Sequence, residues 1–150
     1  MPAVQKITHL NTILEKLYNI DTEFTDADFG LLYGHIKRKV NHRSLLLLYT
    51  NFEHISAMRR QLPFLLAIAK KHVLVLIFFE NTELEELISQ DAENLQTIYH
   101  KTIAEKFSLE KRLMQKELQQ YGIQTILTKP EQLTINTINK YLEIKARGLL

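Results

Sequence analysis

The sequence predicts an α/β protein in which helices flank a parallel β-sheet. Two runs, 44–50 and 73–79, are apolar without alternation, which is typical of strands that are buried on both faces in a parallel sheet. Segments with apolar residues every three or four positions precede, separate and follow these runs, and such an order implies βαβ units. The chain has 150 residues, 45% apolar and 24% charged, which favours one domain over 1–150.

Two helices are expected before the first strand. The first runs from about Ala3 to Asn19 with one apolar stripe, formed by Ile7, Leu10, Ile13, Leu14, Leu17 and Tyr18. The second begins near Thr25, whose hydroxyl resembles an N-cap followed by Asp28, and ends near Lys39. Its buried stripe is predicted to consist of Phe29, Leu32, Tyr33, Ile36 and Val40.

The first strand covers 44–50, and neither of its faces is expected to meet water. A crossover helix over 55–71 leads to the second strand, 73–79, which is rich in β-branched and aromatic residues. Thr82 and Glu85 have the spacing of a capping box and predict a short helix after this strand.

A long helix is predicted from about Glu93 to Gln120, with Gly122 at its C-terminal end. A third strand follows over 123–127, and the last helix covers 134–147. The inward residues of that helix are predicted to be Ile135, Ile138, Tyr141, Leu142 and Ile144. Three strands make a small sheet, and one edge of the first strand is expected to be open.

Composition excludes several chemistries. The chain has no cysteine, which rules out disulfides, thiolate catalysis and iron–sulfur clusters. Its six histidines are scattered without ligand spacing, and no phosphate loop or nucleophile motif occurs, so neither a cofactor nor a metal site is expected. The net charge of +2 gives no strong attraction to nucleic acid. Because no apolar run approaches a membrane span or a signal sequence, we expect a cytoplasmic protein.

Candidate binding residues lie where the strands end. Open α/β sheets bind ligands beyond the carboxyl ends of their strands. This rule selects a set of mostly polar residues, namely Thr50, Asn51, Phe52, Glu53, Glu80 and Asn81, with Thr128 and Lys129 after the third strand. The alternative is that these residue types cap helices and form turns.

Parts of the chain also resemble a known bacterial family. The segments that carry the resemblance are 43–53 (RSLLLLYTNFE), 62–63 (LP), 71–75 (KHVLV), 84–87 (LEEL) and 139–148 (NKYLEIKARG). They resemble the domain-of-unknown-function family with a von Willebrand factor A-like domain, which is often encoded beside MoxR-type ATPases. The resemblance extends from about Tyr33 to the C-terminus and implies the C-terminal half of such a Rossmann-like domain.

The resemblance also carries a functional expectation. Domains of this type hold a metal-ion-dependent adhesion site built from Asp-x-Ser-x-Ser, a separate Thr and a later Thr-Asp. Thr50-Asn51 matches the last element with an amide in place of the carboxylate, and this chain contains no Asp-x-Ser-x-Ser. The resemblance thus implies a noncatalytic protein-interaction module with a degenerate adhesion site and a MoxR-type ATPase as partner. A full-length protein with an upstream half of the domain could be membrane-anchored.

Two alternatives stay open. The chain could pair with a second copy of itself along the edge of 45–49, because pairing satisfies exposed main-chain groups. It could also belong to an enzyme or a metal-binding adhesion domain whose remaining site residues lie outside this chain.

Overall fold

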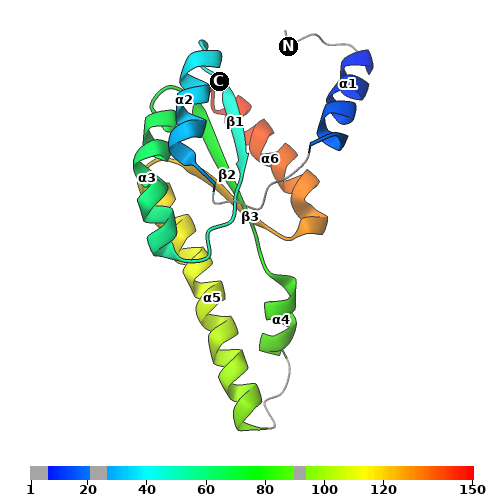
Figure 1. The fold of residues 1–150 in the computed structure, drawn as a ribbon. Coiled ribbons are helices and arrows are strands. Elements are labelled where there is room, and N and C mark those ends of the chain that lie inside the picture. The colour runs from blue at the N-terminus through cyan, green and yellow to red at the C-terminus, as the bar shows by residue number, and fades with distance from the viewer. Residues whose placement is uncertain (1–6, 21–26, 90–93) are drawn as a thin grey trace.

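The computed structural model describes residues 7–20, 27–89 and 94–150. Regular structure follows the predicted order of two helices, a strand, a helix, a strand, two helices, a strand and a last helix (Figure 1). The elements are α1 (Ile7–Tyr18), α2 (Phe29–Lys39), β1 (Leu45–Tyr49), α3 (Ile55–Ala69), β2 (Val73–Phe79), α4 (Thr82–Ser89), α5 (Leu95–Gln120), β3 (Gln124–Thr128), the short 3₁₀-helix η1 (Pro130–Gln132) and α6 (Leu133–Ala146).

The described residues form a three-stranded parallel sheet in the order β1-β2-β3, which confirms the predicted α/β class. β2 lies in the centre, where Leu47 of β1 is opposite Val75 and Ile126 of β3 is opposite Ile77. All residues of β2 except the last are buried. Because both neighbours of β2 are strands and both faces are covered, an unbroken apolar run is what this position requires.

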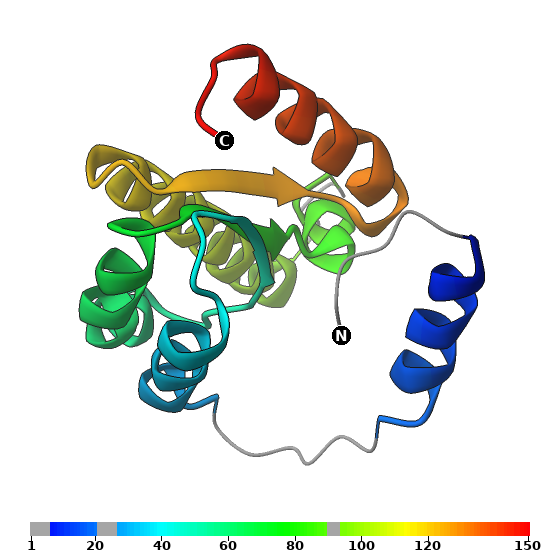
Figure 2. The ribbon, with the colours of Figure 1, turned by 90° about the horizontal axis from the view of Figure 1, so that it is seen from above.

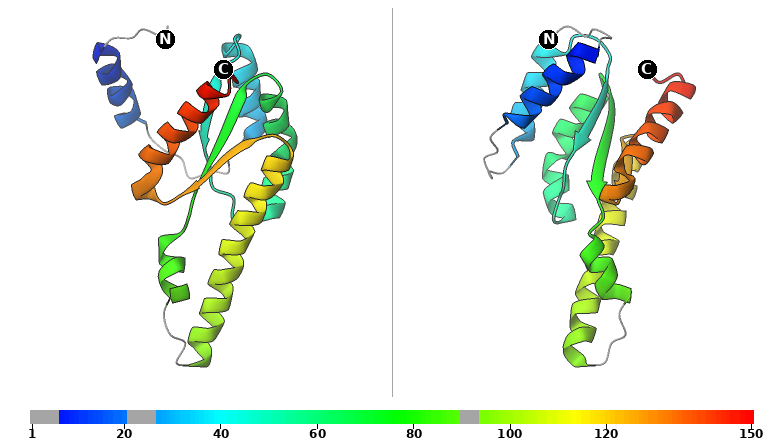
Figure 3. Two further views of the ribbon diagram at one scale, coloured as in Figure 1. Left: turned by 180° about the vertical axis from the view of Figure 1, so that it is seen from behind. Right: turned by 90° about the vertical axis from the view of Figure 1, so that its right-hand side faces the viewer.

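Helices cover the two faces of the sheet unequally. α2, α3 and α5 lie on one face, and α6 lies on the other (Figures 2 and 3). The larger core cluster comprises Phe29, Phe52, Met58, Leu62, Leu65, Ile68, Leu74, Leu76, Phe78, Met114, Leu118 and Ile123. The smaller cluster, on the side of α6, comprises Val73, Val75, Ile77, Ile126 and Ile144. Alternate residues of β2 therefore enter different cores, as the pleat dictates.

The expectation that neither face of the first strand meets water is wrong. Leu47 is 38% exposed and Tyr49 is 51% exposed. Both lie on the same side of the sheet as Val75 and Ile77, to which they are paired, and this is the side of α6. A single helix that packs mainly on β3 leaves the outer strand of that face uncovered. An apolar run cannot reveal this, because it shows only that burial is possible.

The predicted inward face of the last helix is also wrong, except for Ile144, which is buried. Four other residues of that prediction are exposed by 41–63%, namely Ile135, Ile138, Tyr141 and Leu142. The face that contacts the sheet instead includes Leu133 and Ile144, with a buried hydroxyl at Thr137. α6 carries apolar residues around its circumference, so periodicity alone could not choose the buried side.

Helix ends partly follow the sequence prediction. Asp28 caps α2 through its Oδ1, which accepts a hydrogen bond from the Leu31 N–H at 2.8 Å. The predicted N-cap at Thr25 and the predicted starts at Ala3 and Glu93 lie outside the described residues. Gly122 has φ +79° directly after the end of α5, a left-handed conformation that glycine adopts without strain.

α1 is an amphipathic helix, as its spacing predicts, but its apolar stripe is exposed. Leu10, Ile13, Leu14 and Leu17 are 47–58% exposed. The helix stands apart from the sheet, on the side of α6 (Figure 2). None of the helices in the described residues combines the length and the apolarity that a bilayer span requires.

Candidate site at the carboxyl end of the sheet

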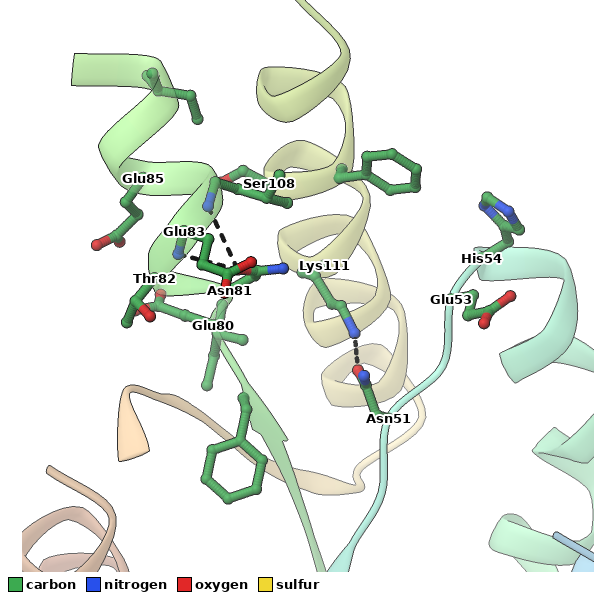
Figure 4. Close-up of a pocket in the computed structure, with 15 residues that line it drawn as sticks. Asn51, Glu53, His54, Glu80, Asn81, Thr82, Glu83, Glu85, Ser108 and Lys111 are labelled. Atoms are coloured by element: carbon green, nitrogen blue, oxygen red, sulfur yellow. Dashed lines mark hydrogen bonds between the residues drawn. The ribbon is translucent and has the colours of Figure 1, made fainter. Parts of the chain in front are cut away.

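A cavity of about 660 Å³ lies at the carboxyl end of the sheet, between the end of β1 and the pair formed by α4 and α5 (Figure 4). Its wall has four parts. Asn51, Glu53 and His54 follow β1, and residues 79–85 run from the end of β2 into α4, which also contributes Ile88. Phe107, Ser108 and Lys111 belong to α5, and Leu127 belongs to β3. α4 and α5 extend beyond the carboxyl ends of the strands (Figure 3). The cavity lies between these two helices and the last residues of β2 and β3.

Four of the six residues that the strand-end rule selected line this cavity: Asn51, Glu53, Glu80 and Asn81. Phe52 does not, because its ring is buried at 6% exposure between Phe29 and Phe78 in the larger core. Thr50 does not line it either, and its N–H extends the ladder by donating to the carbonyl oxygen of Ile77 at 3.1 Å.

The two residues selected after β3 have other contacts. Thr128 is buried, and its Oγ1 accepts a hydrogen bond from Nδ2 of Asn136 at 2.8 Å, which ties β3 to α6. Lys129 forms an ion pair with Glu85 of α4 and thereby borders the cavity wall. The hydrogen bond to Glu85, together with the negative charge of that carboxylate, holds the pKa of Lys129 above its usual value.

Lys111 is the site residue that sequence reasoning missed. From the middle of α5, its Nζ donates to Oδ1 of Asn51 and to the carbonyl oxygen of Phe52 at 2.9 Å (Figure 4). Burial lowers the pKa of Lys111, and the nearby charge of Glu53 acts in the opposite direction. Lys111 is one of many charged residues on a long helix, so no local signal distinguished it from a solvated lysine.

Asn81 has a structural task. Its Oδ1 accepts hydrogen bonds from the N–H groups of Glu83 at 3.0 Å and Leu84 at 3.3 Å, which makes Asn81 the N-cap of α4. The predicted capping box at Thr82 and Glu85 is therefore wrong, because Thr82 is already the first residue of α4 and the cap is Asn81, one residue earlier. The helix-capping alternative that the sequence left open holds for this residue.

His54 lies at the rim. Its Nδ1 is 3.2 Å from Oε2 of Glu110, and its ring stacks on Phe107 with centroids 6.0 Å apart. The side chain of His54 is 56% exposed. These contacts join the start of α3 to α5 and close one side of the cavity.

The charges around the cavity are unequal in number. Four carboxylates line it, from Glu53, Glu80, Glu83 and Glu85, against the single ammonium group of Lys111. The remaining wall is mostly apolar, with Phe79, Leu84, Ile88, Phe107 and Leu127. Nowhere in residues 7–20, 27–89 and 94–150 do three histidine or acidic side chains come together in a way that could hold a metal ion.

Fold and site together define an α/β protein with an acidic and partly apolar cavity at the carboxyl ends of its parallel strands. In comparisons with protein-family models, curated proteins and solved structures, no match to this chain was found.

Proposed function

We propose that this chain is a noncatalytic protein-interaction module that binds a basic segment of a partner protein in the cavity at the carboxyl end of its sheet. The observation that carries the proposal is the combination of four carboxylates with an apolar wall in one cavity. Lysine and arginine side chains have an apolar stem and a cationic head, which fits such a cavity better than a purely polar or purely apolar ligand does.

Two contacts support a binding role over a catalytic one. The Lys111 ammonium donates to Asn51 and Phe52, and Nδ1 of His54 faces Glu110. Both side chains are of types that often act in catalysis, and here both hold α5 against the segment that follows β1. Their contacts shape the cavity, and Lys129 pairs with Glu85, which leaves the carboxylates of Glu53, Glu80 and Glu83 to meet a basic ligand.

The same geometry supports a degenerate adhesion site. In the family resemblance, Asn51 stands where a metal-ion-dependent adhesion site has a carboxylate. Its Oδ1 accepts a hydrogen bond from the Lys111 ammonium, and a cation already bonded to this oxygen opposes the approach of a divalent ion. We therefore retain the proposal of a von Willebrand factor A-like interaction module that acts in the cytoplasm without a metal ion.

The charge of the cavity gives the first test. Peptides selected on the wild-type protein from a random library should be enriched in Lys or Arg beside Leu or Phe. Calorimetry on the best peptide should show binding about tenfold weaker for the double variant Glu80→Gln, Glu83→Gln. Each of its two substitutions removes a negative charge that complements the peptide. Glu105→Gln is the matched control, since Glu105 is exposed on α5 and does not line the cavity. Equal weakening by the control would contradict the proposal.

A MoxR-type ATPase is the partner that the family resemblance implies, and it can enter the same assay. Binding of the purified ATPase should weaken in the double variant and not in Glu105→Gln. An ATPase that binds both variants equally well would place its contact away from the cavity.

Self-association along β1 is a second candidate, favoured by the exposure of this strand. The Val73 N–H donates to the carbonyl oxygen of Ser44, and the Thr50 N–H donates to that of Ile77. The main-chain N–H and C=O groups of the even-numbered residues of β1 thus point toward β2. Those of Leu45, Leu47 and Tyr49 point to the open edge of the sheet. No further described strand lies beyond that edge.

For a dimer paired along this edge, light scattering should show twice the monomer mass at high concentration. Leu47→Lys should return the mass to that of a monomer, because a lysine on an edge strand opposes pairing. Leu31→Lys, on the exposed face of α2, is the control and should leave the dimer intact. A monomer mass at every concentration would remove this candidate.

A further inference from the structure

One side of the sheet exposes apolar side chains that the described elements leave uncovered. Leu47 and Tyr49 of β1 are exposed on the side of α6. α6 itself exposes a stripe of apolar residues at helical spacing, namely Ile135, Ile138, Tyr141 and Leu142. Soluble proteins rarely leave many large apolar side chains in water on one side, and such a surface marks an interaction site.

A helix whose own apolar stripe lacks a cover lies on the same side of the sheet (Figure 2). This helix is α1, which has 12 residues and exposes Leu10, Ile13, Leu14 and Leu17. In the described part of the chain, no residue of α1 belongs to either core cluster, and none of the extensive contacts between elements involves it. Isolated helices of this length are marginal in water, so α1 requires an apolar surface to pack on.

The exposed area of the chain is large enough for a stable dimer. The chain exposes 11294 Å² of accessible surface. Its mass of 17.6 kDa predicts about 7,900 Å² for a compact monomer. The excess of about 3,400 Å² is larger than the roughly 1,000–2,500 Å² that each chain of an obligate homodimer buries.

We propose that two copies of this chain associate through this side, with α1 of each copy packed on the exposed β1 and α6 surface of the other. Parallel sheets have helices on both faces, and the second copy's α1 supplies the cover over β1 that the single chain lacks. Each copy offers one helix and one surface, so a two-fold pair uses both and closes. The interface consists of side chains on a face of the sheet. It therefore differs from main-chain pairing along the β1 edge, and it is separate from the cavity between α4 and α5.

Light scattering across a concentration range gives the first test, with twice the monomer mass expected for the wild-type protein. Leu14→Asp should raise the dissociation constant of the dimer by more than about tenfold, because each dimer would bury two carboxylates in an apolar interface. Leu109→Asp is the matched control and should leave the dimer intact. Leu109 is 57% exposed on α5, on the opposite face of the sheet, and Leu14 is 54% exposed, so neither substitution changes a core.

Cross-linking gives the second test, because the chain has no cysteine and introduced thiols are unique. A mixture of the Leu14→Cys and Ile138→Cys variants, treated with a short bismaleimide, should yield a covalent dimer with one copy of each variant by mass spectrometry. A mixture of Leu109→Cys and Ile138→Cys is the control and should stay uncross-linked.

Three outcomes would overturn the proposal. The first is a monomer mass at every concentration. The second is a dimer that persists in Leu14→Asp, since its contact would then lie elsewhere, for example along the β1 edge. The third is a cross-link within single chains of the double variant Leu14→Cys, Ile138→Cys, because α1 would then cover its own sheet. Binding of basic peptides in the cavity is independent of all three results.

Discussion

Replacing Phe78 with alanine should lower the free energy of unfolding by about 3–5 kcal/mol. Phe78 is 1% exposed in the central strand, and its ring centroid is 6.1 Å from that of Phe52. Phe52 in turn stacks on Phe29 at 5.5 Å. The variant would leave a void where β2, the segment after β1 and the start of α2 meet, and such a void has no means of closing without movement of all three.

Urea denaturation followed by circular dichroism measures this loss. Phe64→Ala is the matched control, because Phe64 is 37% exposed on α3, and it should cost less than half as much. Similar losses for the two variants would mean that the aromatic cluster does not hold the core together.

Replacing Lys111 with alanine should lower the free energy of unfolding by about 1–3 kcal/mol, because it leaves the carbonyl oxygen of Phe52 and the amide of Asn51 without their donor. Lys106→Ala on an exposed position of the same helix should have little effect. Hydrogen exchange at 51–53 should become faster in the Lys111 variant alone. Unchanged exchange would show that Lys111 does not order this segment.

The same lysine should make stability depend on pH in the alkaline range. Burial lowers the pKa of Lys111 in the folded state, whereas the unfolded chain keeps a value of about 10.4. Between these two pKa values the unfolded state binds more protons than the folded state, so the free energy of unfolding rises with pH. Below the folded-state value Lys111 is protonated in both states and contributes no pH dependence. Lys111→Met should remove the rise. A wild-type and a variant protein with parallel pH profiles would contradict this expectation.

The fold was largely predictable because β2 and its crossover helix depend on local signals. The run 73–79 is β-branched, aromatic and uninterrupted, and the structure forms a strand over the same residues. Predictions failed where burial depends on which neighbours are present. β1 and α6 are as apolar as buried elements, yet each of them is covered by neighbouring elements on one side only. Which side is covered depends on the rest of the fold and not on local periodicity.

The candidate site was predictable in position but not in composition. The carboxyl ends of parallel strands meet at one end of the sheet, and for this reason Asn51, Glu53, Glu80 and Asn81 line the same cavity. Lys111 is 60 residues from Asn51, and a contact of that separation depends on where α5 crosses the sheet. The distinction between Phe52 and its polar neighbours likewise depends on the aromatic core beneath them.

The order of the strands in the sheet has a consequence for how the protein folds. Because β1, β2 and β3 lie side by side in the same order as in the chain, each new strand adds to the edge of the one before it. No strand has to insert between two others, and the β1-α3-β2 unit is complete within residues 45–79. The closure between β1 and β2 spans only residues 50–72, whereas the closure between β2 and β3 spans 80–123. Because the entropic cost of closure grows with loop length, the β1-α3-β2 unit is expected to form before β3 joins it. The sheet can therefore assemble in the direction in which the ribosome makes the chain.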